Sequence, residues 1–149
     1  TNVNITDNTP QTLHLTDTAA NMKSVLVRNN INNIADGMCR FNFVHLMPNV
    51  PAVDLYLNGV LMRANIPYLG ASGAMDIPVG INAPGFVSGA TTIWAVRAAG
   101  ATSTSAALVS FASASGLISG GALTGFCMGY SGATGARLPF LAMTLDKNQ

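Results

Sequence analysis

The sequence predicts an all-β protein, an antiparallel β-sandwich of the immunoglobulin-like or jelly-roll type with an extended N-terminal arm. Short segments in which apolar and polar residues alternate recur along the chain, and this is the period of a half-buried strand. Clusters of Gly, Pro, Asn and Ser separate the segments at the spacing that is typical of sandwiches. We therefore expect an N-terminal extension over residues 1–37 and a sandwich domain over residues 38–149.

The N-terminal extension carries two short alternations, one at Val3 and Ile5 and the other at Leu13 and Leu15. An extended arm of this kind adds a strand to the edge of another sheet, and its alternate side chains fill pockets there. We predict that these four residues form a donor arm at a subunit interface. The alternative is that the arm pairs within its own chain as the first strand.

Residues 17–34 of the extension fit two local structures. Asp17 or Thr18 could cap a helix, whereas residues 24–28 have the composition of a strand. We favour the strand. A turn-rich linker follows, and Asp36 and the glycine after it predict a tight turn at its end.

The sandwich domain begins with a strand in which Phe41, Phe43 and His45 alternate with other residues. A proline-rich loop follows, and then a strand at residues 53–57. Asn58-Gly59 is the strongest short hairpin signal, because both central positions of a type I′ turn need positive φ. We expect residues 60–62 to pair back onto the preceding strand.

Five later segments also have the composition of strands, each separated from the next by Gly, Ser, Thr or Pro. Their interleaved Thr, Ser and Gly disfavour long helices, even in the alanine-rich tract. The expected strands are residues 75–80, 91–98, 106–112, 122–130 and 138–145.

Residues 44–59 read VHLMPNVPAVDLYLNG. This segment resembles the opening of the bacterial and archaeal family called domain of unknown function 4397, whose members read like V-H-x-x-P-x-x-P-x-V-D-V-Y-V-D-G. The resemblance covers about residues 39–149 and implies an exported or cell-surface β-sandwich without an established activity. Asn49 stands where the family usually has an acidic residue. The motif positions, which we interpret as structural, are His45, Pro48, Pro51, Asp54, Tyr56 and Gly59.

The composition of the chain favours self-association. Seven basic and six acidic residues give a net charge of +1, Glu is absent, and 49% of the residues are hydrophobic. A soluble monomer usually has a surface of about 25–35% charged residues. We expect other copies of the chain to cover part of this weakly charged surface. The lack of basic runs argues against nucleic acid and against a polybasic membrane contact, and no window predicts a transmembrane helix.

No pattern in the sequence predicts an enzyme, a cofactor or a metal site. We interpret His45 as a strand residue whose ring is satisfied by hydrogen bonds, and Asp54 as a residue that orders the proline-rich loop through local backbone bonds. Acid–base catalysis explains these two residues less well. No GxSxG turn and no cluster of metal-ligating residues occurs. Cys39 and Cys127 are either two buried thiols or a disulfide, within the chain or between chains.

The predicted function is that of a secreted structural protein at the cell surface. In this hypothesis the chain, which begins at Thr1 and which we interpret as a processed form, is a homopolymer subunit of an extracellular filament, pilus-like fibre or surface layer. It self-assembles by donor-strand complementation. The alternative is a monomeric adhesion module that recognises a surface glycan or protein through the proline-rich loop and the glycine-rich loop near Tyr130.

Overall fold

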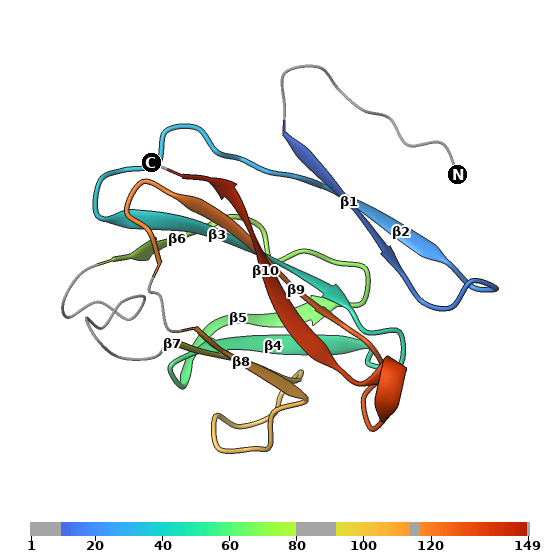
Figure 1. The fold of residues 1–149 in the computed structure, drawn as a ribbon. Helices are drawn as coiled ribbons and strands as arrows, with labels where there is room; N and C mark the ends of the chain where they lie inside the picture. Colours follow the sequence, from blue (N-terminus) through green and yellow to red (C-terminus); the bar gives the residue numbers. More distant parts are fainter. Residues whose placement is uncertain (1–9, 80–91, 114–116, 149) are drawn as a thin grey trace.

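A computed structural model describes residues 10–79, 92–113 and 117–148. These residues form ten β-strands and one 3-10 turn, which confirms the all-β class (Figure 1). The elements in chain order are β1 (Gln11–Thr16), β2 (Lys23–Arg28), β3 (Met38–Leu46), β4 (Ala52–Leu57), β5 (Val60–Pro67), β6 (Met75–Pro78), β7 (Thr92–Ala98), β8 (Val109–Ser113), β9 (Ala122–Met128), η1 (Gly135–Arg137) and β10 (Phe140–Lys147).

Two four-stranded sheets form the sandwich. Their strand orders are β10-β9-β3-β6, which we call the β3 sheet, and β5-β4-β7-β8, which we call the β4 sheet. Apolar side chains from the facing sides of both sheets form one buried core. At its centre the rings of Phe41 and Trp94 stack with centroids 4.1 Å apart. Burial of such large side chains is the main stabilising contribution to a fold of this size.

The β3 sheet departs from the predicted antiparallel arrangement at one position. β3 pairs with β9 in parallel, with Arg40 opposite Ala122 and Leu46 opposite Met128. The other strand pairs of the sandwich are antiparallel in the described residues. Alternation within each strand predicts which side chains face the core, but it carries no information on the direction of the neighbouring strand.

β1 and β2 form a separate antiparallel hairpin that lies on the outer side of the β3 sheet (Figure 1). Val27 of the hairpin clusters with Val44 and Leu46 of β3, so the second half of β3 is buried on both faces. The Thr16 hydroxyl donates to the Leu46 carbonyl at 2.7 Å. The His14 ring lies 5.3 Å from the Phe126 ring.

The prediction of an extended donor arm over residues 1–37 is corrected for residues 11–28, where the hairpin agrees with the alternative that the arm pairs within its own chain. Leu13 pairs with Leu26 and Leu15 with Ser24 of the same chain, so β1 is not a free donor strand. The strand prediction for residues 24–28 is confirmed, and the helix alternative is wrong. Leu13 and Leu15 instead point outward, with exposed fractions of 45% and 50%. Val3 and Ile5 lie outside the described residues.

The turn between β4 and β5 confirms the hairpin signal. Asn58 has φ of 47° and Gly59 has φ of 81°, as a type I′ turn requires.

A glycine is also required at Gly125 on β9, here because of close packing. A Cβ at this position would lie 2.6 Å from the Cζ atom of Phe41, so a larger residue would displace the central stacked ring.

Candidate functional site

His45 is buried inside the fold and makes no contact with solvent. Its Nε2 lies 2.8 Å from the Val50 carbonyl, to which it donates as an N–H. In that tautomer Nδ1 accepts from the Met47 N–H at 3.4 Å and faces the Cys127 sulfur at 3.5 Å. Burial lowers the pKa of the imidazole, which keeps it neutral. His45 is therefore a packed and hydrogen-bonded strand residue, the role that the sequence predicted for it.

Asp54 is also buried, but its partners differ from those predicted. One carboxylate oxygen accepts from the Asn65 N–H at 2.7 Å, and the other accepts from the Gly100 N–H at 2.9 Å. The prediction that Asp54 orders the proline-rich loop is therefore wrong. The carboxylate instead fills an irregularity in the β4–β5 ladder, where Asn65 has φ of 54°, and holds the turn that follows β7.

The other motif residues also have structural positions. The Tyr56 hydroxyl donates to the Ala101 carbonyl at 3.0 Å, and the Arg97 guanidinium lies 4.7 Å from the Tyr56 ring centroid. The Pro51 carbonyl accepts from the Tyr68 N–H at 2.9 Å and so closes the open end of the β4–β5 hairpin. Pro48 lines a surface pocket beside Tyr130.

The two cysteines are free and buried, which agrees with the buried-thiol alternative and not with a disulfide within the chain. Cys127 lies opposite His45 on β3, six positions from Cys39. At about 3.3 Å per residue this separation is roughly 20 Å, far beyond the Cα distance of a disulfide. Neither thiol is exposed enough to bond to another chain. Burial raises the pKa of Cys127 to about 12, which makes it a protonated thiol rather than a nucleophile.

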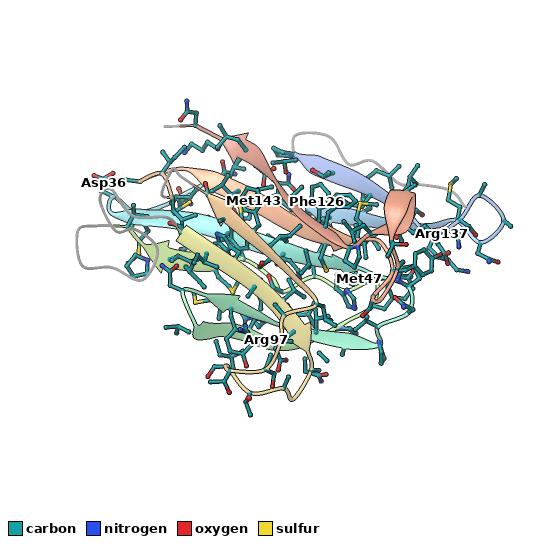
Figure 2. The ribbon with its side chains drawn as sticks, turned by 60° about the horizontal axis from the view of Figure 1, so that its bottom comes forward. Asp36, Met47, Arg97, Phe126, Arg137 and Met143 are labelled. Carbon is teal, nitrogen blue, oxygen red and sulfur yellow. The ribbon has the colours of Figure 1, made fainter. Side chains whose placement is uncertain are left out.

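The strongest candidate site lies at the end of the molecule where three connections meet. These connections are the β1–β2 turn, the proline-rich loop after β3 and the loop between β9 and β10. Figure 2 shows Met47 and Arg137 at this end, next to the hairpin turn. A pocket of about 290 Å³ opens here, between Thr16, Asp17, Pro48, Tyr130, Arg137 and Phe140.

The proline-rich and glycine-rich loops are joined at this end by a reciprocal pair of hydrogen bonds. The Asn49 amide donates to the Ser131 carbonyl at 3.0 Å, and its oxygen accepts from the Ser131 N–H at 2.9 Å. Both loops belong to the binding surface predicted by the alternative hypothesis. The sequence did not predict this role of Asn49, although the residue departs from the motif that the segment resembles.

A charged and aromatic cluster forms one wall of the pocket. The Tyr130 hydroxyl donates to the Asp17 carboxylate, and this bond lowers the pKa of Asp17 and raises that of Tyr130. The Arg137 guanidinium lies 5.7 Å from the centroid of the Tyr130 ring. An aromatic ring beside a guanidinium and a carboxylate can hydrogen-bond and stack against a neutral polar ligand. The sequence did not identify Asp17 or Arg137, because they come together only through the fold.

Within the described ranges, no group of three or more His, Cys, Asp or Glu side chains could hold a metal ion. No helix in this part of the chain has the length and apolar character needed to cross a membrane. No family model matches the chain, and no curated protein matches it either. The resemblance to the family of unknown function therefore stays a prediction.

Proposed function

We propose that this chain is a structural subunit of an extracellular filament or surface layer that assembles from copies of itself. The observation that carries the proposal is the β1–β2 hairpin. It is a sheet of only two strands, and neither strand has a second neighbour among the described residues. Unpaired strand edges are templates for pairing with another chain. A two-stranded hairpin is only marginally stable by itself. This hairpin is stabilised on one face by packing on the β3 sheet, and pairing at its edge with another subunit would add to that stability.

The outer face of the hairpin supports the same proposal. Leu13 and Leu15 leave about half of their side-chain surface exposed, and Leu26 lies beside Leu13 on the partner strand. A weakly charged chain with an exposed apolar strand face gains free energy when a second copy covers that face. If one subunit's edge pairs with a different surface of the next subunit, the contact is heterologous. Such contacts continue as a filament unless the rotation closes a ring.

The test is the oligomeric state over a range of concentrations, measured by analytical ultracentrifugation and negative-stain microscopy. We expect oligomers that grow with concentration. Leu15→Lys places a charge on the outer face of the hairpin without touching the core, and it should shift the distribution toward monomer. Leu61→Lys is the matched control, because Leu61 is 49% exposed on β5, away from the hairpin. A chain that stays monomeric at every concentration contradicts the proposal.

A second candidate is a binding module for a surface glycan or protein, and the pocket beside Tyr130 supports it. The Asn49–Ser131 bonds fix two loops at one end of the molecule, as a preorganised site requires. The test is a glycan array followed by isothermal titration calorimetry of any hit. Arg137→Ala should abolish binding in the folded protein, whereas Arg63→Ala on the remote strand β5 should not change it. Equal losses from both variants contradict this site.

A further inference from the structure

We infer that a groove beside β2 is the acceptor site for an incoming strand, and that the strand is the N-terminal segment, residues 1–9, of a second copy. The inference rests on the proposed function, because it names the surface through which the subunits assemble. It also replaces the predicted role of β1, since Leu13 and Leu15 are already paired within the chain. The proposed donor strand is therefore only the part of the predicted arm that precedes β1.

The groove has a volume of about 450 Å³ and runs along β2 over the outer side of the β3 sheet. One wall is residues 25–30, and the opposite wall is the β5–β6 connection at Leu69, Ala71 and Ala74. Six consecutive residues line the first wall. Alternate side chains of a strand point to opposite faces, so a groove on one face would be lined by every second residue only. The groove therefore follows the edge of β2 rather than one of its faces.

The backbone of this edge is available for pairing. The Asn29 N–H donates to the Pro10 carbonyl at 2.8 Å, which marks a hydrogen-bonded pair of the β1–β2 ladder. Bonded and non-bonded pairs alternate along an antiparallel ladder. By the observed register, Leu26 and Arg28 then belong to non-bonded pairs. Their N–H and C=O groups point away from β1, toward the side where the described residues provide no strand.

The floor of the groove contains polar side chains beside Ala122 and Leu123, and one unsatisfied acceptor. Asn42, Thr124 and Asp146 face the groove from three strands of the β3 sheet. Asn29, which is 7% exposed, also lines it. The Asn29 amide nitrogen donates to Thr12, but its oxygen has no hydrogen-bond partner among the described residues. A buried acceptor without a donor is unfavourable, and an incoming strand would supply an N–H or a side-chain donor.

The N-terminal segment has a pattern that fits this surface. Val3 and Ile5 alternate with Asn2, Asn4 and Thr6. If the segment adds to the edge of β2, one set of side chains faces the floor of the groove and the other set faces outward. With the Asn and Thr side chains inward, they lie near the polar side chains of the floor. The valine and isoleucine then extend the outward apolar face of the hairpin.

Charge favours the N-terminal segment as the donor strand, and chain connection favours the segment of a second copy. Arg28 lines the groove and forms no ion pair with another described residue, and the segment brings Asp7. The contact between Pro10 and Asn29 places the entrance of β1 beside the exit of β2. To reach the far edge of β2, the segment of the same chain would have to cross that exit. Connections at the same end of a sheet do not cross in most folds, whereas a second copy approaches freely.

Crosslinking between two full-length variants, each with one added cysteine, tests the site. One variant carries Asn4→Cys and the other carries Asn42→Cys on the groove floor. We expect a disulfide-linked dimer when they are mixed under mild oxidation. It should form about a hundredfold faster than with Ser103→Cys, a control in the exposed β7–β8 connection, because binding holds the two thiols at millimolar effective concentration. The native cysteines are buried and do not compete.

Four results would overturn the inference. One is equal crosslinking to the groove and to the control. Another is closure of an intrachain disulfide in a dilute Asn4→Cys/Asn42→Cys double variant, which would place the chain's own segment in the groove. Oligomers with no crosslink to Asn42→Cys would reject this groove but leave the proposed self-assembly intact. A protein that is monomeric at every concentration would reject both proposals.

A backbone variant provides an independent test. Leu26→Pro removes an N–H that points away from β1, and proline is tolerated on an edge strand at such a position. We expect this variant to keep the emission of buried Trp94 and to lose the oligomers. Leu26→Ala keeps the N–H and is the matched control. Oligomers that persist in the folded proline variant would exclude strand addition at this edge.

Discussion

Asp54→Ala should destabilise the protein by about 3 kcal/mol without unfolding it. Asp54 is 4% exposed and accepts two backbone N–H groups, at 2.7 and 2.9 Å. Hydrogen bonds to a charged group contribute about 1.5–3 kcal/mol each. When the carboxylate is removed, the Gly100 N–H lies in a turn and can hydrogen-bond to water instead. We therefore use the lower value, about 1.5 kcal/mol, for each of the two bonds. A domain of this size has a total stability of about 5–15 kcal/mol. The variant therefore stays folded in buffer.

The assay is equilibrium unfolding in urea, followed by the emission of Trp94, the single tryptophan, which is buried against Phe41. Asp54→Asn tests the two hydrogen bonds more specifically than Asp54→Ala. An amide has one acceptor oxygen where both carboxylate oxygens are used, so its NH₂ group must face a backbone N–H. We expect Asp54→Asn to lose at least about 1.5 kcal/mol, whereas exposed Asp36→Asn should stay within about 0.5 kcal/mol of the wild type. Equal stability of Asp54→Asn and the wild type would refute the structural role.

Three further predictions concern the core and the buried titratable groups. Gly125→Ala should destabilise the protein by about 1–3 kcal/mol, since its Cβ would lie 2.6 Å from Phe41; unchanged urea midpoints would contradict this packing. Burial lowers the folded-state pKa of His45 below 6.5, so the unfolded state binds more protons at acidic pH and stability should fall as the pH drops below 6.5. His45→Gln should flatten this decline, leaving the part due to His14, whose pKa burial also lowers; identical slopes in both proteins would exclude the effect. Both cysteines should resist a thiol reagent at pH 8 until urea unfolds the protein, because burial raises the pKa of Cys127 to about 12; rapid labelling of the native protein would contradict their burial.

The sequence predicted the strands and turns well because these depend on local signals. Asn58-Gly59 predicted its turn, since both residues must adopt positive φ. The alternation of Phe41 and Phe43 predicted the core face of β3. The same alternation at Leu13 and Leu15 did predict a strand. It could not say whether that strand pairs within the chain, because periodicity describes the faces of a strand and not its partner.

The candidate site was predictable only in part. The proline-rich and glycine-rich loops were recognised as separate features, but the bonds between Asn49 and Ser131 join residues 82 positions apart. The carboxylate of Asp54 was assigned to the wrong loop for the same reason. Its partners, Asn65 and Gly100, approach it only after β4 has paired with β5 and β7.

The sequence by itself determined the all-β class, the places where strands begin and turn, and the weakly charged surface, because composition and short-range alternation act within a few residues. Only the tertiary structure decided that β1 pairs with β2, that β3 runs parallel to β9 and that the two thiols lie far apart. Strand order and side-chain partners depend on contacts between residues distant in the chain. These contacts are selected when the whole core packs, and no single segment encodes them.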